Sequence, residues 1–239
     1  MTEPSDQAGQ LIITADDWGY SPGYNAGIEE AARAGAVDAV SVLVLRPACE
    51  PAPLLEAGVE IGLHLELPEG AGHDEALLAP RRQAEAFERL FGAPPDYIDG
   101  HHHCHAALPL ASAVEELAMQ LRVPVRSVGE DHRYRLQELG VPCPDRLIGR
   151  LHEGEPVLPR LLAEALQGGT LPEGATEWVV HPGHRDPDCG SGYDRGREED
   201  LNLLLRLAEE GSLAAARTTH RSALAARARV PGGPERGGS

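Results

Sequence analysis

The stretch Leu11–Tyr20 (LIITADDWGY), followed by Ser21–Asn25 (SPGYN), decides the fold class of this 239-residue chain. LIITA is a short apolar run, which is typical of a buried strand. Ser21 is a favourable helix N-cap and Pro22 a favourable first helical residue, so we expect a helix directly after the polar turn. A buried strand that leads straight into a helix is the opening of a β/α unit.

The rest of the chain repeats this alternation. Short connections between strands and helices imply a mainly parallel sheet covered by helices. We predict a single-domain α/β protein with a (β/α) barrel-like fold, either closed or distorted and incomplete; a doubly wound open sheet is the alternative. The domain is expected at 10–228, between flexible tails at 1–9 and 229–239. Further strands are expected at 40–45, 61–65, 97–98, 123–127 and 177–180, and helices at 22–33, 53–57, 80–91, 108–121, 158–167, 196–210 and 221–228.

The charge of the chain excludes several partners and mechanisms. Its 38 acidic and 21 basic residues give a formal net charge of −17, and every basic residue is arginine. Without lysine there is no Schiff-base or P-loop lysine, and the acidic surface argues against nucleic acid and anionic membranes as partners. The polar N-terminus differs from a signal peptide, so we expect a cytoplasmic protein with free cysteines.

Polar side chains gather where the predicted strands end. Asp16 and Asp17 end the first strand, His64 lies near the end of the third, and His181 closes the strand at 177–180. The segment Asp99–His105 (DGHHHCH) follows another strand. Because the carboxyl ends of parallel strands form one rim, these side chains are expected to meet there.

Neutral imidazole and carboxylate are good ligands for zinc and related divalent metals. If the histidine segment is extended, Asp99, His101, His103 and His105 share one face. Each feature also has a simpler interpretation. The two aspartates can be turn residues, His64 a core histidine, and the histidine run a fortuitous metal-binding tract.

Two further features have competing interpretations. Trp18, beside the two aspartates, is either a stacking platform for a pyranose ring or a core aromatic. The charged run Arg195–Asp200 is expected to form the solvated first turn of a helix.

Four segments together resemble the YdjC-like carbohydrate deacetylases, also called chitooligosaccharide deacetylases. They occur in the family's order and cover about residues 10 to 210. The most specific is the first, with ADDWG followed by SPGYNAGI. This family has a (β/α) barrel-like fold, in agreement with the alternation described above. The segments are TADDWGYSPGYNAGI (14–28), IGLHL (61–65), YIDGHHHCH (97–105) and WVVHPG (178–183).

The resemblance implies roles for individual residues. It makes Asp17, His64 and His101 the ligands of one divalent metal ion, Zn²⁺ or Mg²⁺ by preference, with Co²⁺ or Ni²⁺ as alternatives. Asp16 becomes the general base and His181 assists as general acid. Residues that orient the ligands or contact substrate are then Asp99, His103 and His105, with Trp18 as the candidate sugar platform.

The implied substrate is an N-acetylated sugar or a short chitin-type oligosaccharide, and the implied assembly is a homodimer. Two departures from the family pattern concern the substrate more than the reaction. Gly100 stands where relatives usually carry Ser or Thr, and the segment between His64 and Asp99 is short.

Metal-dependent deacetylation is therefore the first functional hypothesis. Two histidines and one carboxylate also form the ligand set of non-haem Fe(II) oxygenases, but most of those have an all-β fold. Another barrel metal hydrolase, such as a phosphoesterase, is less compatible with the charge of −17. A non-catalytic sugar- or metal-binding protein would not need both Asp16 and Asp17.

Overall fold

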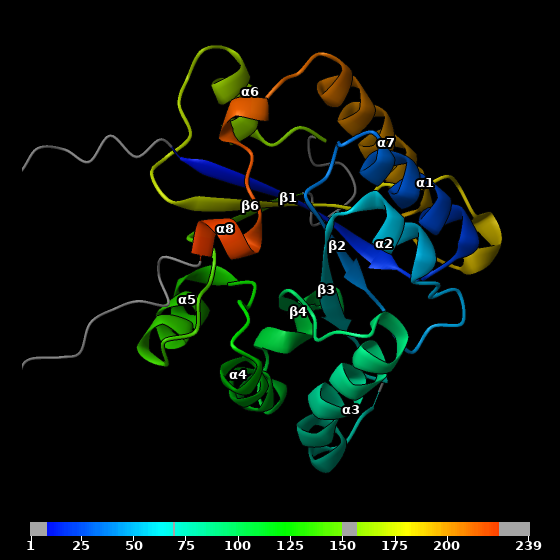
Figure 1. Ribbon diagram of the computed structural model, residues 1–239, viewed down its shortest axis with the longest axis vertical. Coiled ribbons are helices and arrows are strands. Elements are labelled where there is room, and N and C mark those ends of the chain that lie inside the picture. Colours follow the sequence, from blue (N-terminus) through cyan, green and yellow to red (C-terminus); the bar gives the residue numbers. More distant parts are fainter. Residues whose placement is uncertain (1–8, 69, 150–156, 225–239) are drawn as a thin grey trace, which may run out of the picture.

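The computed structural model describes residues 9–68, 70–149 and 157–224, which form one α/β unit (Figure 1). Its strands make a single sheet in the order β4-β3-β2-β1-β6-β5, and every pair of neighbours is parallel. The strands are β1 (Gln10–Trp18), β2 (Ala39–Val42), β3 (Glu60–Leu65), β4 (Ile98–Gly100), β5 (Arg146–Gly149) and β6 (Ala175–Val180).

Helices surround this sheet, which curls into a half-barrel (Figure 1). The prediction of a single-domain α/β fold with a distorted, incomplete barrel is confirmed. The α-helices are α1 (Pro22–Arg33), α2 (Ala52–Ala57), α3 (His73–Phe91), α4 (Leu110–Leu121), α5 (Gly129–Glu138), α6 (Arg160–Leu166), α7 (Asp194–Glu209) and α8 (His220–Leu224), and the 3₁₀ helices are His101–Ala106, Pro187–Cys189 and Ala214–Ala216.

Local sequence explains the opening β/α unit. All residues of β1 after Gln10 are buried, as expected for a central strand with both faces covered. The Ser21 side chain accepts a hydrogen bond from the Tyr24 amide and caps α1, with Pro22 in its first turn. Buried side chains of α1, including Ile28, then join the aliphatic core beneath the sheet.

One predicted strand is wrong and one strand was missed. In the segment 123–127, Val125 makes only an isolated parallel bridge with Ile98. Pro124 has no amide hydrogen and cannot extend the ladder, although its carbonyl accepts from the Ile98 amide. The missed strand is β5, which lies at the edge of the sheet opposite to β4. Its short, half-buried sequence RLIG lacks the apolar run by which strands were predicted.

Several helix boundaries also differ. The helix expected at 80–91 begins at His73 and contains Pro80, and the polar segment of α5 was not predicted as a helix. The last predicted helix is described as far as Leu224, and 225–228 lie outside the described residues. The predicted tails lie outside them as well, apart from Gly9, which is buried.

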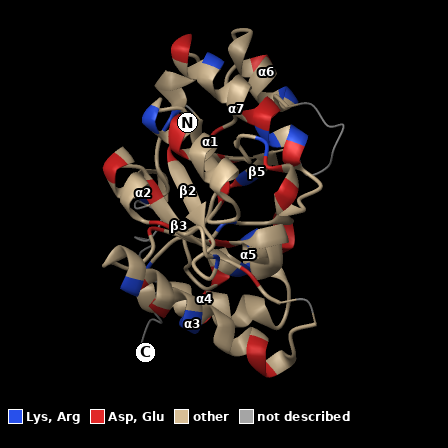
Figure 2. Cartoon of the chain, turned by 90° about the vertical axis from the view of Figure 1, so that its right-hand side faces the viewer, with Lys and Arg blue, Asp and Glu red and all other residues tan. Residues whose placement is uncertain are grey.

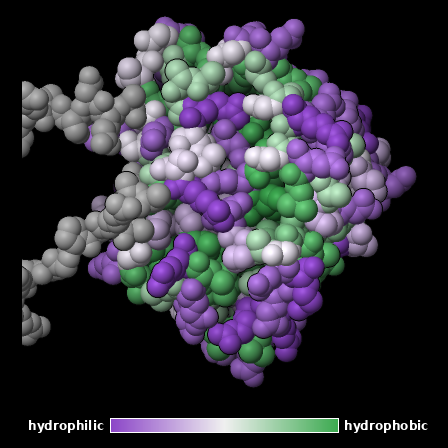
Figure 3. All heavy atoms as spheres, in the orientation of Figure 1, coloured by the Kyte–Doolittle hydropathy of each residue, from purple (hydrophilic) through white to green (hydrophobic). Residues whose placement is uncertain are grey.

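Charged groups are spread over the outer helices rather than gathered on one side, as Figure 2 shows for one face. In Figure 3 hydrophilic side chains likewise interrupt the apolar surface. Within the described ranges, no helix has the length and apolar character required to cross a membrane.

Candidate functional site

A cavity of about 620 Å³ opens at the carboxyl ends of β1, β3, β4 and β6. This is the rim at which the polar strand ends were expected to meet. Five of the residues singled out in the sequence line it together: Asp16, Asp17, His64, His101 and His181.

A β-bulge allows two neighbouring aspartates to face this cavity. Side chains of successive strand residues normally point to opposite faces. Here three steps along β1, from Ala15 to Trp18, match only two steps along β2, from Val40 to Val42. The extra residue is accommodated by Asp17, whose φ of 76° lies in the left-handed region. Such a conformation costs free energy in a non-glycine residue, and strained residues of this kind cluster at functional sites.

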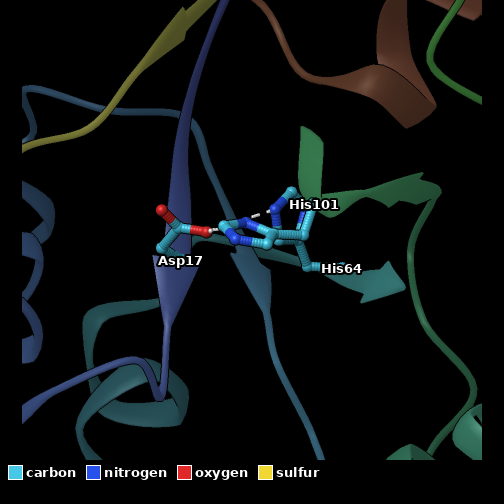
Figure 4. A group of neighbouring side chains, drawn as sticks. All are labelled: Asp17, His64 and His101. Atoms are coloured by element: carbon cyan, nitrogen blue, oxygen red, sulfur yellow. Dashed lines mark ion pairs between the residues drawn. The ribbon is translucent and has the colours of Figure 1, made fainter. Parts of the chain in front are cut away.

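Asp17, His64 and His101 converge from three strand ends (Figure 4). The Oδ1 atom of Asp17 lies 3.3 Å from His64 Nε2 and 2.8 Å from His101 Nδ1. Asp17 and His64 are buried, whereas the His101 side chain is 20% exposed and faces the cavity. The three donor atoms all lie within 4.8 Å of one another.

The chemistry of this group fits a divalent cation. Asp17 Oδ1 is buried, yet it accepts no hydrogen bond of good geometry. One carboxylate oxygen and two imidazole nitrogens are suitable ligands for zinc and similar metals and leave coordination positions open. Asp16, His64 and Asp99 form a second cluster of donors, but Arg126 occupies the oxygens of Asp16. The first cluster is therefore the better cation site.

Asp99 fixes the orientation of His64. Its Oδ1 atom lies 2.7 Å from His64 Nδ1, so the other ring nitrogen, Nε2, faces Asp17. Ser41 donates to the second oxygen of Asp99. Burial alone would lower the pKa of His64, but the charges of Asp99 and Asp16 raise it to about 10. A carboxylate behind a ligating histidine is a common device for orienting the ring.

Arg126 holds Asp16 in a bidentate ion pair. Its NH1 and NH2 atoms donate to the two carboxylate oxygens at 2.7 and 2.8 Å, and both side chains are buried. Burial alone would raise the pKa of Asp16, but the charges of Arg126 and His64 and the hydrogen bonds from Arg126 together hold the pKa well below its usual range. Asp16 is therefore ionised near neutral pH.

Arg197 orients the carboxylate of Asp17 in a similar way. Its NH2 atom donates to Asp17 Oδ2 at 2.5 Å, which leaves Oδ1 directed toward the two histidines. The guanidinium lies over the ring of Tyr24, 3.9 Å from its centre. The prediction that Arg195–Asp200 forms a solvated helical turn is therefore wrong in part, because Arg197 and Asp200 are 2% and 4% exposed.

His181 lies at the end of β6 on the cavity wall. Its amide donates to Asp200 Oδ2 at 2.9 Å, which ties the strand end to α7. Burial lowers the pKa of the ring to about 4, despite the nearby charges of Asp17 and Asp16. Its Nδ1 atom is buried with no hydrogen-bond partner among the described residues.

The histidine segment is not extended, so its side chains do not alternate as the sequence alone indicated. Residues 101–106 form a 3₁₀ turn in which His102 and His103 have φ values of 51° and 56°. His103 lines the cavity. His105 does not, because it is fully buried and its Nε2 contacts the Arg126 carbonyl at 3.0 Å. Of the predicted orienting groups, Asp99 touches a ligand, whereas His105 contacts the backbone of Arg126.

The prediction of Trp18 as a sugar platform is corrected by its position. The side chain is 1% exposed, belongs to the hydrophobic core, and donates its Nε1 hydrogen to the Glu50 carbonyl. The bulge that turns Asp17 toward the cavity leaves Trp18 in the core. The aromatic side chains on the cavity wall are instead Tyr20 and Tyr193.

Sequence reasoning missed Arg126, Arg197 and Tyr193. Arg126 follows an apolar segment, VPV, and a charged residue that closes a buried run was the available signal. Arg197 lies in a run of charges that is typical of a solvated helix, so its burial could not be recognised from local sequence. Tyr193 comes from the loop before α7, which nothing in the sequence placed at the cavity.

The chain is similar to known proteins over most of its length. The family model described as YdjC-like protein matches residues 10–80 and 71–208. A carbohydrate deacetylase of Geobacillus stearothermophilus is 32% identical, over 81% of this chain and 88% of its own length. A chitooligosaccharide deacetylase of Serratia marcescens is 30% identical, over 81% and 90%.

Among solved structures, a protein of Enterococcus faecalis V583 provisionally described as a cellobiose-phosphate cleavage protein has the same fold. It superposes with a TM-score of 0.75 at 22% identity, covering 91% of this chain and 99% of its own. The family model alone spans most of the described residues, with the bulged aspartates and the cavity histidines inside it. The chain belongs to the YdjC-like family.

Proposed function

We propose that this protein is a metal-dependent hydrolase that removes the N-acetyl group from an N-acetylated sugar or short chitin-type oligosaccharide. One observation carries the proposal. The buried Oδ1 atom of Asp17, which accepts no hydrogen bond, meets two imidazole nitrogens beside the ionised carboxylate of Asp16. Metal-assisted amide hydrolysis uses these two features side by side: a cation site for the acyl oxygen and a proton acceptor for water. The deacetylase names of the two relatives support the reaction type.

Asp17, His64 and His101 would hold the cation. When bound, a divalent cation polarises the acetyl carbonyl and makes water easier to deprotonate, effects worth several kcal/mol. The residues fit Zn²⁺ as well as Mg²⁺, Co²⁺ or Ni²⁺, because imidazole and carboxylate are ligands for all of them.

Asp16 would take the proton of the attacking water. It lies next to a ligand, with Oδ2 3.9 Å from His64 Nε2, and Arg126 keeps it charged and fixed. The low pKa makes Asp16 a weak base but guarantees that it is unprotonated. Positioned acid–base groups of this kind contribute about 10²–10⁴-fold to a rate.

His181 would protonate the departing amine from the β6 side of the cavity. Because burial lowers its pKa to about 4, the ring is neutral near pH 7 in the free site. Such a ring would give up a proton readily once the proton that Asp16 accepts from water has passed to it, so the proton lost by water is the one that reaches the amine. This sequence of events agrees with a proton that leaves water first and reaches nitrogen later.

Sugar rings would be held by aromatic and polar side chains on the wall. Tyr20 and Tyr193 present aromatic rings, and the ring of Tyr193 lies 5.5 Å from that of His181. The loop residues Gly190, Ser191 and Gly192 line the same wall and leave room for a ring. The α/β fold argues against the oxygenase alternative, because most proteins of that class are all-β.

Acetate release tests the proposal. Chelator-stripped protein reloaded with Zn²⁺, Mg²⁺ or Co²⁺ is offered a panel of N-acetylated sugars that includes diacetylchitobiose. We expect acetate release by the wild type from at least one sugar, and loss of this activity in Asp16→Asn with its metal retained. Asp74→Asn, an exposed aspartate on α3, is the matched control and should behave as the wild type. Absence of acetate release across the whole panel would reject the function.

A further inference from the structure

A series of ion pairs runs from Asp16 through the interior of the half-barrel, away from the cavity. Arg126, which holds Asp16, also contacts Glu177 Oε1 through Nε and NH2, at 3.0 and 2.9 Å. Glu177 Oε1 lies 3.3 Å from His220 Nε2, and His220 Nδ1 lies 3.2 Å from Glu60 Oε2. Of these side chains Arg126, Glu177 and His220 are fully buried.

This chain of contacts ends at the opposite end of the sheet from the cavity. Glu60 is the first residue of β3, and His220 begins α8. The segment before α8 is fixed to the amino end of β1, where the Thr218 amide donates to the Leu11 carbonyl. α8 therefore closes the amino-terminal end of the half-barrel, near β1 and β6 in Figure 1.

His220 is held from three sides. Each of its ring nitrogens faces a different carboxylate, and its backbone amide donates to Glu60 Oε2 at 2.7 Å. Its ring stacks on Tyr97, with centres 3.9 Å apart and planes 15° apart. The Tyr97 hydroxyl bonds Ser41, which donates to Asp99. His220 is thus linked both to the partner of Asp16 and to the partner of His64.

The position of Arg126 depends on carboxylates on two sides. Asp16 and Asp99 contact its NH1 and NH2 atoms from the cavity side, and Glu177 contacts Nε from the other. A buried guanidinium tolerates no unpaired donor without a penalty of about 1–3 kcal/mol or more. Loss of Glu177 would therefore leave Nε unpaired and let the guanidinium shift, and Asp16 with it.

We propose that Glu177 and His220 are positioning residues for the catalytic base, so that the C-terminal helix α8 supports the chemistry at the far end of the sheet. The inference rests on the proposed function, in which Asp16 is the base. His220 keeps Glu177 in place, Glu177 keeps Arg126 in place, and Arg126 orients the carboxylate that meets water. Neither Glu177 nor His220 lines the cavity, so neither touches the substrate.

Steady-state kinetics of Glu177→Gln and His220→Gln test the proposal. Both replacements retain polar contacts but lose the paired charges. We expect kcat to fall about tenfold, at the lower end of what loss of an orienting partner costs, while KM and the metal dissociation constant change less than twofold. Leu224→Ala is the matched control on the same helix, because Leu224 belongs to the apolar cluster of Ile12, Ala175 and Ala223. It should lower the melting temperature and leave kcat unchanged.

The double variant separates positioning from general damage. If His220 acts through Glu177, the kcat of the double variant Glu177→Gln/His220→Gln should be no lower than the kcat of Glu177→Gln alone. Losses that multiply, or kcat values equal to the wild type, would overturn the proposal. So would a fall in kcat of the same size in Leu224→Ala.

A magnetic resonance measurement keeps the inference distinct from the deacetylase activity. The ¹³Cζ resonance of Arg126, assigned with Arg126→Lys, reports the surroundings of the guanidinium whether or not a substrate is known. It should move in Glu177→Gln and His220→Gln and stay in place in Leu224→Ala. If a variant does not fold, the same resonance in the wild type should move as His220 titrates; a constant position would refute the link. A wild type inactive on every sugar, with these shifts present, would reject the proposed function and leave the link established.

Discussion

The two ends of the half-barrel interior use the same residue types in opposite ways. At the amino end, the ring nitrogens of His220 face two separate carboxylates, Glu177 and Glu60. At the cavity end, ring nitrogens of His64 and His101 face the same oxygen of Asp17. In the first arrangement, the Glu177 oxygen that faces His220 is also contacted by the guanidinium of Arg126. The second gathers ligand atoms around one point and leaves Asp17 Oδ1 without a proper hydrogen bond.

The difference between the two ends shows how a ligand site can be distinguished from a structural network of buried ion pairs. Burial and a raised pKa do not separate the two, because nearby carboxylates raise the pKa of His64 to about 10 and that of His220 to about 9. The arrangement of partners does separate them. Ligand atoms that converge on a carboxylate oxygen beside a cavity indicate a cation site, whereas a carboxylate oxygen that a buried guanidinium already contacts indicates a scaffold.

The largest expected effect is the loss of metal in His64→Ala. Removing one of three ligands should weaken Zn²⁺ binding by more than the roughly 10–100-fold that loss of an outer partner costs, and should abolish acetate release. Calorimetric titration of the chelator-stripped protein with Zn²⁺ measures this loss of affinity. His184→Ala, at an exposed histidine that pairs with Glu30, serves as control and should bind metal normally. Equal affinities in the two variants would contradict the assignment.

Asp16→Asn should separate chemistry from metal binding. We expect kcat to fall by about 10²–10⁴-fold, as for loss of a positioned base, with one metal still bound. The neutral amide cannot accept the proton of water, but the three ligands remain. Stopped-assay kinetics measure the fall in kcat, and metal analysis on the same preparation shows whether the metal is retained. Metal loss in this variant would make Asp16 a ligand instead.

Asp99→Asn should weaken metal binding by about 10–100-fold, the usual effect of a partner behind a ligand. The reason is that His64 Nδ1 loses a charged partner at 2.7 Å and the ring is oriented less firmly. The matching change at the other end, Glu60→Gln, alters a partner of His220 and should leave metal affinity unchanged. If both variants lost affinity equally, the two ends would not be distinct.

The smallest expected effect concerns stability at high pH. Burial alone would lower the pKa of His220, but hydrogen bonds with Glu177 and Glu60 raise it from 6.5 to about 9. The folded protein therefore holds a proton that the unfolded chain releases. The resulting stability is fully present below about pH 6.5 and is lost as the pH rises through about 9.

Between pH 7 and 10, the wild type should therefore lose more unfolding free energy than His220→Gln, by on the order of 2 kcal/mol. Denaturant titrations at the two pH values measure the difference. Parallel losses in the two proteins would show that His220 carries no such charge.

Much of the fold and of the candidate site was predictable because the carboxyl ends of parallel strands lie at the same edge of a sheet. The alternation of elements predicted the fold class, and the polar residues at strand ends predicted which side chains meet at the cavity. Asp16, Asp17, His64, His101 and His181 were all expected there. Local sequence sufficed for them because each lies in the last residues of a buried strand or directly after it.

The remainder depends on tertiary contacts that leave no local pattern. Arg126 and Glu177 are 51 positions apart and meet only because their segments pack together in the interior. Arg197 looked like part of a solvated turn, since its buried partner Asp17 is 180 positions away. Trp18 was misplaced because a bulge, which cannot be recognised from alternation, decides which face it takes.

The central claim is that the cavity holds one catalytic cation on Asp17, His64 and His101. The most direct test titrates Zn²⁺ into chelator-stripped protein while acetate release from an active sugar substrate is followed in the same sample. We expect that activity starts near zero, rises linearly and reaches its plateau at one equivalent of metal, and that Asp17→Ala shows neither binding nor activity. Full activity of the stripped wild type, or an Asp17→Ala variant that binds one equivalent and remains active, would contradict it.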